Sequence, residues 1–343
     1  MKLKLPAPRD FDFRTAVCSH GFFVLAPNEW VPPAGPLQTT VALDDNRAVA
    51  VQVSGADGVV SARSSASLSP AERRIVSAAI RRMLRLDEDL SAFHALCEAS
   101  DTHRRAAETR FGRLLRSATL FEDIVKVICT CNVAWRQTVA MVNAMVSKWG
   151  IPVESSSEPL TAKLDSGSSP LVRARSAPKP KSLRLSRSFP TPLRLARVRE
   201  STLKRIARVG YRAPFIAKLA RDVADGRVDL EAIERFTGPS HDLHRRLRQI
   251  RGVGDYAAGN LAMLLGRYDR LAVDTEMLRL LREREPGRTW TPAAARERYA
   301  AWKDYAFLAY WFELWEDYSH RHGRAEEWWP QTVGAQITRR PGV

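Results

Sequence analysis

Cysteine is scarce in this chain of 343 residues. The four cysteines, Cys18, Cys97, Cys129 and Cys131, are too few and too scattered to form a disulfide scaffold. Cys129 and Cys131 form a C-x-C pair within an apolar helical run, which is not the spacing of a zinc finger. We therefore expect reduced thiols that are buried in the core. The seven histidines, most of them in arginine-rich segments, complete no cluster that indicates a metal site.

Long hydrophobic runs are absent as well. No segment contains the ~18 consecutive apolar residues that a membrane span requires. The N-terminal stretch MKLKLPAPRDFDF has no continuous apolar core and no cleavage-site pattern, so it does not resemble a secretion signal. The sequence therefore predicts a cytoplasmic protein without a membrane partner, associated with the nucleoid if its source is a bacterium.

Acidic residues are outnumbered in this chain. The 54 lysines and arginines exceed the 38 aspartates and glutamates, which gives a net charge of +16 and an isoelectric point near 10.2. A positive field of this size attracts polyanions, of which nucleic acid is the commonest. The hydrophobic fraction of 45% is ordinary for a globular protein that buries a core. We therefore expect a folded, monomeric protein that binds nucleic acid.

The hydrophobic pattern changes once along the chain. Residues 1–66 carry β-type runs at 21–27, 37–43 and 48–55, which indicate a small antiparallel sheet. Helical periodicity begins after Ser69, the expected N-cap, with Pro70 at the first helical position. The expected helices are 70–85, 89–97, 101–115, 120–148, 200–208, 212–225, 229–236, 241–250, 255–265, 274–284, 292–300 and 302–320.

One interval breaks the helical pattern. Residues 151–199 are rich in serine and proline and carry ten lysines and arginines against three acids. Most of this interval cannot bury enough apolar surface to fold by itself. We expect a flexible basic insertion over 151–190.

A glycine turn lies between two apolar helical runs in the segment LRQIRGVGDYAAGNLAMLLGRYDRLAVDTEMLR, residues 247–279. Gly252 and Gly254 flank Val253, permit positive φ and let a phosphate approach the backbone. The amides of the turn and of the next helix, which begins at Asp255 or Tyr256, form an anion site. The alternative is a corner whose glycines only let two helices pack closely. The basic chain favours the grip on a DNA backbone, which does not depend on base sequence.

The hairpin is followed about twenty residues later by VDT and a helix. This arrangement resembles the helix-hairpin-helix (HhH-GPD) superfamily of DNA glycosylases. Three other segments are similar to the 3-methyladenine DNA glycosylase II and 8-oxoguanine glycosylase branches. They are TLFEDIVKVICTCNVAWRQT, GYRAPFIAKLA and YAAWKDYAFLAYWFELW. The resemblance covers most of residues 70–320.

The resemblance implies an α+β fold with a mostly helical core. The expected parts are an N-terminal antiparallel β domain (1–66), a helical subdomain with the wedge-bearing helix (67–150), the basic insertion (151–190), the helix-hairpin-helix catalytic subdomain (191–325) and a C-terminal tail (326–343).

Asp274 occupies the position of the family's catalytic aspartate. Breaking an N-glycosidic bond builds positive charge on the deoxyribose. A carboxylate beside that sugar stabilises the charge and can orient or deprotonate a water molecule. Position alone indicates an N-cap aspartate, and the two roles can coexist. We expect the helix N-terminus to keep Asp274 ionised.

Tyr256 occupies the hairpin position that is a lysine in bifunctional relatives. A phenol cannot form the imine that this lysine forms, and the position is aromatic in the 3-methyladenine branch. The resemblance therefore implies a monofunctional enzyme that uses water as the nucleophile and leaves an abasic site. Lys303 or another lysine near the site keeps a lyase step open.

The base pocket follows from the same resemblance. Tyr256 and Trp311 match aromatic positions that flank the flipped base, where electron-rich rings favour a cationic, N-alkylated purine. Most aromatic residues of the expected helix 302–320 are interpreted as core. Asn260, one turn after Tyr256, is either a contact to the base edge or a buried structural amide.

Asn132 falls at the wedge position, where a side chain fills the space that the flipped base leaves in the duplex. The 8-oxoguanine branch uses asparagine here, whereas the alkylbase branch tends to use an apolar residue. Gly21 matches the position where the 8-oxoguanine branch makes a backbone contact to its base. The expected partner is thus double-stranded DNA with a damaged base: an alkylated purine is favoured, and 8-oxoguanine, uracil or a deaminated purine remain alternatives.

No cofactor is expected. The iron–sulfur cluster of the endonuclease III branch needs four cysteines after the catalytic aspartate, and this chain has none after Cys131. The sequence leaves open whether the hairpin carbonyls bind a monovalent cation. A different class also remains, that of a catalytically silent hairpin protein that only binds DNA.

Overall fold

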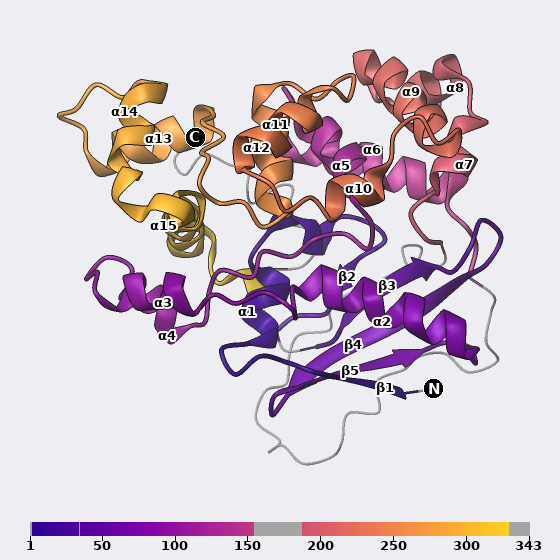
Figure 1. The fold of residues 1–343 in the computed structure, drawn as a ribbon, viewed down its shortest axis with the longest axis horizontal. Helices are drawn as coiled ribbons and strands as arrows, with labels where there is room; N and C mark the ends of the chain where they lie inside the picture. The colour runs from indigo at the N-terminus through magenta and orange to yellow at the C-terminus, as the bar shows by residue number, and fades with distance from the viewer. Residues whose placement is uncertain (1, 34, 154–186, 329–343) are drawn as a thin grey trace.

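The computed structural model describes residues 2–33, 35–153 and 187–328, as one antiparallel sheet beside a larger body of helices (Figure 1). This architecture confirms the α+β fold expected from the sequence. Most of the basic insertion predicted for 151–190, and most of the tail predicted for 326–343, lies outside the described residues.

The sheet has five strands in the order β1-β5-β4-β3-β2. Their bounds are β1 (Lys2–Pro6), β2 (Glu29–Trp30), β3 (Leu37–Ala42), β4 (Ala48–Ala56) and β5 (Val59–Ser64). The predicted runs 37–43 and 48–55 became the paired strands β3 and β4, in which Leu37 faces Val53. Val49, Val51 and Val53 are all buried, because β4 turns this face to the core.

The predicted β run 21–27 is not a strand. It holds the short 3-10 helix η1 (Gly21–Val24), which follows the helix α1 (Phe13–Cys18). Asn28 closes the turn, since its side-chain amide donates to the carbonyl of Phe22 over 3.0 Å. A short apolar run that is buried on all sides has no periodicity that separates a strand from an irregular core segment. The prediction of a strand at 21–27 was therefore wrong.

The helical body contains most of the chain's regular structure. Its helices are α2 (Pro70–Leu84), α3 (Ser91–Glu98), α4 (Arg104–Glu108), α5 (Leu120–Thr130), α6 (Trp135–Trp149), α7 (Pro192–Ala196), α8 (Glu200–Ile206), η3 (Gly210–Arg212), α9 (Ala213–Ala224), α10 (Leu230–Glu234), α11 (Ser240–Arg248), α12 (Asp255–Leu264), α13 (Thr275–Arg284), α14 (Pro292–Arg298), η4 (Ala300–Tyr305), α15 (Ala306–His322) and η5 (Ala325–Glu327). Ser69 caps α2 as predicted, because its hydroxyl accepts from the backbone N–H of Glu72 while the Glu72 carboxylate accepts from that of Ser69.

Three predicted helices are broken at residues with positive φ: Arg110 (φ 55°), Asn132 (φ 53°) and Lys303 (φ 48°). The expected helix 101–115 keeps only α4, 120–148 divides into α5 and α6, and 302–320 starts as η4 before α15 begins. Apolar periodicity continues through each break, so it does not reveal a single left-handed residue that tertiary contacts hold in place.

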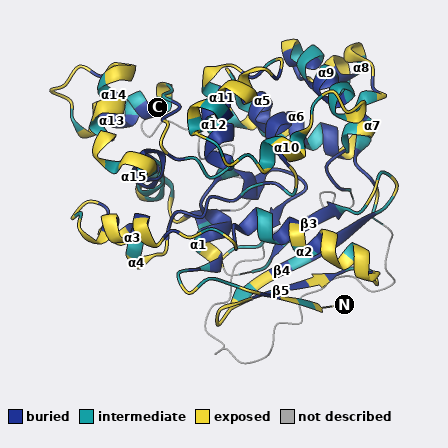
Figure 2. Cartoon of the chain, viewed as in Figure 1, coloured by how far each residue is buried: buried dark blue, intermediate teal, exposed yellow. Residues whose placement is uncertain are grey.

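The C-terminal end of the described chain packs against the edge strand β2. The indole N–H of Trp30 in β2 donates to the carbonyl of Glu326 over 2.8 Å, and Trp328 is buried. The inner faces of the helices and the helix-facing side of the sheet are buried, whereas outer turns are exposed (Figure 2). One continuous hydrophobic core therefore joins the sheet to the helices.

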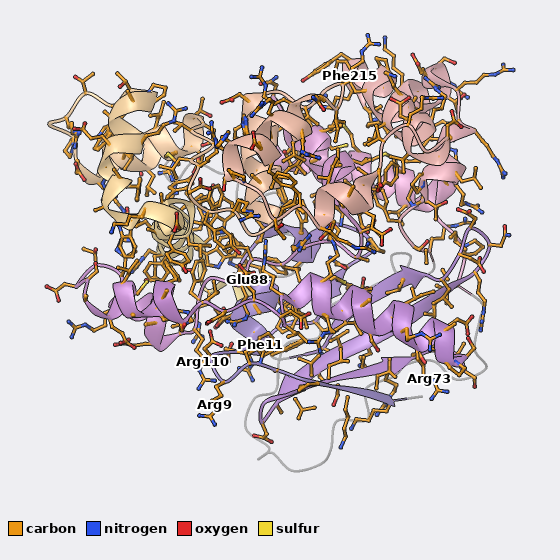
Figure 3. All side chains as sticks on the ribbon, viewed as in Figure 1. Arg9, Phe11, Arg73, Glu88, Arg110 and Phe215 are labelled. Carbon is orange, nitrogen blue, oxygen red and sulfur yellow. The ribbon has the colours of Figure 1, made fainter. Side chains whose placement is uncertain are left out.

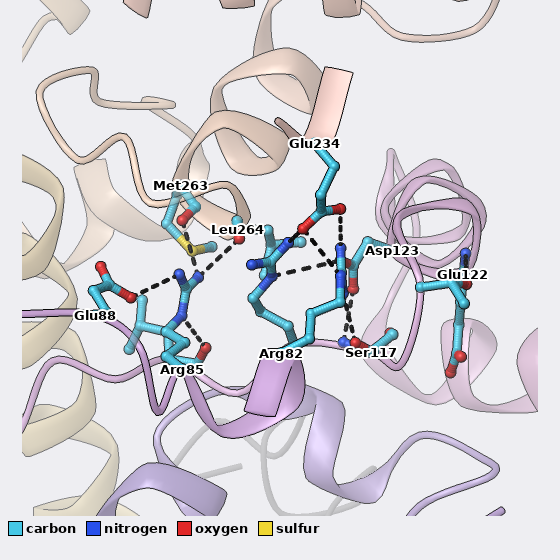
Figure 4. Close-up of polar contacts among 12 residues, drawn as sticks. Arg82, Arg85, Glu88, Ser117, Glu122, Asp123, Glu234, Met263 and Leu264 are labelled. Atoms are coloured by element: carbon cyan, nitrogen blue, oxygen red, sulfur yellow. Dashed lines mark hydrogen bonds and ion pairs between the residues drawn. The ribbon is translucent and has the colours of Figure 1, made fainter. Parts of the chain in front are cut away.

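Buried charges connect helices that are distant in the sequence (Figure 4). Arg82 of α2 lies 2.8 Å from the carboxylate of Asp123 in α5 and 2.9 Å from that of Glu234 in α10. Arg116 also contacts Glu234, and Asp123 accepts a hydrogen bond from the Ser117 N–H over 2.8 Å. Burial, the largest effect, raises the pKa of Asp123, but the two guanidinium charges lower it by more, so it lies below its usual value.

Replacing Asp123 by Asn is expected to lower the free energy of unfolding at neutral pH by about 3–5 kcal/mol, because Arg82 and Arg116 keep their burial and lose the more deeply buried of their two counter-charges. The lowered pKa means that this stability is present above the unfolded-state pKa and is lost as the pH falls through the folded-state value. Denaturant titrations across pH measure both effects. Glu234→Gln, at a more exposed carboxylate, is the control with a smaller cost, and equal stability of Asp123→Asn and the parent at neutral pH would contradict the prediction.

Candidate active site

The hairpin between α11 and α12 needs glycine at one position for two reasons. Gly252 has a φ of 93°, and a Cβ placed on it would lie 2.6 Å from the Cβ of Phe215 in α9. Gly254 instead has a φ of −82° and open space around it, so only the first glycine uses positive φ. Asp255, rather than Tyr256, is the first residue of α12.

The start of α12 has no side-chain cap. Gly254 is the N-cap and offers no acceptor to the first amides of the helix, which therefore stay available to an anion. The Val253 N–H closes the turn by donating to the carbonyl of Ile250 over 3.0 Å. Arg251 lies with its guanidinium 6.0 Å from the ring centre of Phe215, which Figure 3 labels at the end of the helical body away from the sheet. The turn thus presents backbone donors on a basic surface.

Asp274 is the N-cap of α13 and is bonded to the hairpin helix. Its Oδ1 accepts from the backbone N–H of Met277 over 2.8 Å, and its Oδ2 accepts from the hydroxyl of Tyr256 over 3.2 Å. Tyr256 lies in the first turn of α12, so the predicted catalytic carboxylate lies directly beside the hairpin turn. The N-cap role is confirmed, and it leaves Asp274 partly exposed.

Burial raises the pKa of Asp274 above its usual value. The hydrogen bonds from Met277 and Tyr256 lower this pKa, and the charge of Glu276 raises it. The N–H of Met277 at the helix N-terminus favours the ionised form, as expected, but desolvation outweighs it, so the net direction of the pKa is upward. Burial also raises the pKa of Tyr256, which keeps its phenol protonated as a hydrogen-bond donor.

Trp311 lies in α15 and packs against the segment before η1. Its indole N–H donates to the carbonyl of Ser19 over 2.8 Å, and its ring stacks on Phe307 with 5.6 Å between ring centres and a 17° interplanar angle. Tyr310, the preceding residue, has its pKa raised by burial and further by the charge of Asp274. The first turns of α15 therefore lie next to the Asp274–Tyr256 pair.

The other predicted aromatic residues are divided between two elements. Trp302 and Tyr305 belong to η4, not to one long helix as expected, because the chain turns at Lys303. Trp302 packs 4.3 Å from the ring centre of His103 and Tyr305 5.6 Å from that of Phe93. Both belong to the core beside α3 and α4.

The amide of Asn260 is used within its own helix. Its Nδ2 donates to the carbonyl of Tyr256 over 2.9 Å. This bond supports the structural role that the sequence left open, and a contact between Asn260 and a base edge stays a prediction.

Asn132 projects from the break between α5 and α6. It is exposed, and its Nδ2 donates to the hydroxyl of Tyr211 over 3.3 Å. Tyr211 is 54% exposed and carries the guanidinium of Arg212 4.4 Å from its ring centre. Tyr211 was not among the residues predicted from the sequence, although an aromatic residue between Gly210 and a basic residue was a signal for it.

Two residues that the sequence did not assign, His20 and Trp135, lie next to Gly21. A Cβ on Gly21 would come within 2.8 Å of the indole of Trp135, the first residue of α6. His20 packs 5.3 Å from Trp311. The Nε1 of Trp135 and the Nδ1 of His20 are buried and have no hydrogen-bond partner among the described residues.

His20 is neutral at physiological pH, because burial lowers its pKa to about 4. A free indole N–H and a neutral imidazole nitrogen therefore lie near the Gly21 backbone. No local pattern in the sequence predicts this, because the two groups come from segments more than a hundred residues apart.

Lys303, the candidate for a lyase step, lines a cavity together with Asp255 and Gly259, and neither Asp274 nor Tyr256 belongs to that lining. No group of three or more His, Cys, Asp or Glu side chains suited to a metal ion occurs in the described ranges. No helix among them is long and apolar enough to cross a membrane.

Replacing Tyr256 by Phe is expected to raise the pKa of Asp274 further, because the variant loses the hydroxyl that donates to its carboxylate. An NMR titration of the side-chain carbons, with aspartate labelled selectively, measures this pKa. Tyr211→Phe is the control, since it removes a hydroxyl that bonds Asn132 instead. An unshifted Asp274 titration in the Tyr256 variant would show that the 3.2 Å contact contributes nothing.

Solved structures of three proteins cover nearly all of the chain. The 3-methyladenine DNA-glycosylase from Archaeoglobus fulgidus has a TM-score of 0.67 at 15% identity, over 92% of this chain and 98% of its own. The 8-oxoguanine glycosylase/lyase of Clostridium acetobutylicum, in its apo form, has 0.64 at 14% identity, over 91% and 94%. MBOgg1, solved with a low-affinity DNA ligand, has 0.64 at 18% identity, over 92% and 96%.

Neither a protein-family model nor a curated protein matches the chain by its sequence. At identities of 14–18% the likeness concerns the fold. Two of these neighbours are named as glycosylases, one for 3-methyladenine and one for 8-oxoguanine. The chain therefore has the fold of the helix-hairpin-helix DNA glycosylases, with an antiparallel sheet ahead of the helical core.

Proposed function

We propose that this protein is a monofunctional DNA glycosylase, which flips a damaged base out of duplex DNA and hydrolyses its N-glycosidic bond. The observation that carries the proposal is the bond between Asp274 and Tyr256, which joins a partly buried carboxylate to the first turn after a glycine hairpin. The pair occurs on a fold shared with DNA glycosylases of two substrate types.

The hairpin is the proposed grip on the DNA backbone. Uncapped amides at the start of α12 bind a phosphate of the strand that carries the lesion. The net charge of +16 supplies the attraction to DNA that does not depend on sequence. Asn132, exposed at the α5–α6 break, enters the duplex as the flipped base leaves. A monomer is sufficient for this arrangement.

Asp274 performs two tasks in the proposed reaction. Its charge stabilises the cationic sugar that forms as the bond to the base breaks. Its Oδ atoms orient water and accept its proton, for which the raised pKa is suited. The products are the free base and an abasic site.

Tyr256 is the reason for proposing hydrolysis without strand cleavage. A lyase step needs an unprotonated amine at the sugar, and the phenol at this position provides none. Lys126 is fully buried and paired with Glu122 over 2.6 Å, so it is engaged elsewhere. Lys303 lines a cavity whose lining includes neither Asp274 nor Tyr256.

An alkylated purine is the proposed substrate, because Tyr256 and Trp311 give electron-rich walls for a cationic base. A specific observation favours a second candidate, a neutral base such as 8-oxoguanine or a deaminated purine. The unpartnered Nε1 of Trp135 and Nδ1 of His20 can bind a donor–acceptor edge, which gives such a base its identity.

The experiment that tests the proposal measures base release from duplexes that each carry one lesion: 3-methyladenine or 7-methylguanine, 8-oxoguanine, uracil or hypoxanthine. Strand breaks are expected only after hot alkali, and from one lesion class. Asp274→Asn is expected to slow release by about 10²–10⁴-fold. Because Asn remains a good N-cap, the variant should keep its fold and its affinity for DNA.

Breaks without alkali, or a complex trapped by borohydride, would assign the chemistry to a lysine. Tight DNA binding with no release from any duplex would move the protein to the silent binding class. Unchanged release by Asp274→Asn would remove Asp274 from the reaction.

Base release is also expected to depend on pH through Asp274. The ionised form is active and its pKa is raised, so the rate falls during acidification at a higher pH than an exposed aspartate would give. Single-turnover rates across pH measure this acidic limb of the pH–rate profile. Tyr256→Phe should move the limb to still higher pH, and a limb at the same pH in both proteins would contradict the assignment.

A further inference from the structure

A cavity of about 400 Å³ lies beside the hairpin helix and is separate from the Asp274–Tyr256 pair. It begins at Asp255, the residue directly after the glycine turn, and extends to the chain segment before α13, to α14 and to η4. Three cationic side chains line it, from Arg270, Arg296 and Lys303.

None of these three cations has a hydrogen bond, ion pair or ring contact with another side chain in the described parts of the chain. Neighbouring arginines differ in this respect. Arg298, two residues after Arg296 in α14, is bonded to Glu285 over 2.8 Å and to Glu313 over 2.9 Å. Arg298 is therefore satisfied by carboxylates, whereas the three lining cations are exposed and unpaired.

The backbone supports a role for Lys303. Its φ of 48° and ψ of −118° interrupt η4, a conformation that costs free energy for any residue with a side chain. Such residues persist where the surrounding structure fixes them, and they cluster at ligand sites.

Two carboxylates also line the cavity and oppose an anion. Asp255 lies 3.3 Å from the Nε2 of His244, which is a lining residue as well. Asp269 has no partner among the described residues. The three cations outnumber these two acids, and an arginine fork binds phosphate with two parallel hydrogen bonds.

We propose that this cavity is a second phosphate site, which holds a phosphodiester of the same DNA duplex next to the one on the hairpin amides. The proposal rests on the DNA binding proposed above. Phosphates follow one another at about 3.4 Å along the axis for each strand, so a strand fixed at Gly254 presents its next phosphates to the cavity that starts at Asp255. Lys303 then contacts the backbone and takes no part in covalent chemistry.

The test uses the full chain with Arg270→Gln, Arg296→Gln and Lys303→Gln combined, and it measures affinity for an undamaged duplex from low to high salt. Each lost phosphate contact is expected to reduce the slope of log Kobs against log salt by about 0.9, so the slope should fall by about 2–3. The substituted side chains are exposed and unpaired, and thermal unfolding verifies that the fold is kept.

A matched control removes the same charge from another surface: Lys2→Gln, Arg73→Gln and Arg74→Gln, all exposed on the N-terminal part. Figure 3 labels Arg73 beside the sheet, away from the hairpin helices. The control is expected to change the slope by much less than the cavity variant. Equal slopes in the two triple variants would overturn the proposal.

Calorimetry with inorganic phosphate and with a mononucleotide, without DNA, separates the two sources of phosphate. Micromolar binding that the cavity variant loses would assign the cavity to a free phosphate compound and overturn the DNA assignment. Asp274→Asn, tested for base release and for DNA affinity, separates the proposed glycosylase activity from the proposed second phosphate site. Loss of base release with full DNA affinity supports the glycosylase even where the cavity variant behaves like its control.

Discussion

Two buried arginines hold the parts of the candidate site in place by donating to carbonyl groups at helix ends. Arg85 donates to the last carbonyls of α12, over 3.0 Å each, and Arg212 donates to those of α5. A guanidinium removed from water must satisfy its donors, and the final carbonyls of a helix lack partners within it. Each pairing therefore satisfies both the guanidinium donors and the helix carbonyls. The helix dipole also favours a positive charge at the C-terminal end of the helix. The hairpin helix and the wedge loop are therefore fixed by one kind of interaction.

This arrangement leaves the opposite ends of the same elements available to a ligand. The C-terminal end of α12 is held in the core, so its N-terminal amides face outward behind Gly254. Beyond the held end of α5, the chain turns at Asn132 with positive φ and exposes that side chain. Tyr256 then connects the outward end of α12 to Asp274, which places the carboxylate one hydrogen bond from the hairpin.

The sequence predicted the features that depend on neighbours along the chain. The Ser69 N-cap, the glycine turn and the N-cap position of Asp274 are local, and the structure has them all. It did not predict the breaks at Asn132 and Lys303, because distant contacts hold a left-handed residue within an apolar pattern. The groups around Gly21 were missed for the same reason: His20 and Trp135 meet only through the tertiary fold.

Burial has two opposite effects on Asp274 in the proposed reaction. A low dielectric strengthens the attraction between the carboxylate and a cationic sugar, which is the main source of stabilisation. The same desolvation raises the pKa and so reduces the ionised fraction, but it also makes the carboxylate a better acceptor of a proton from water. The hydroxyl of Tyr256 and the N–H of Met277 limit the rise, since both donate to the ionised form. A lysine at position 256 would add a positive charge beside Asp274 and lower its basicity, so a neutral phenol suits an enzyme whose nucleophile is water.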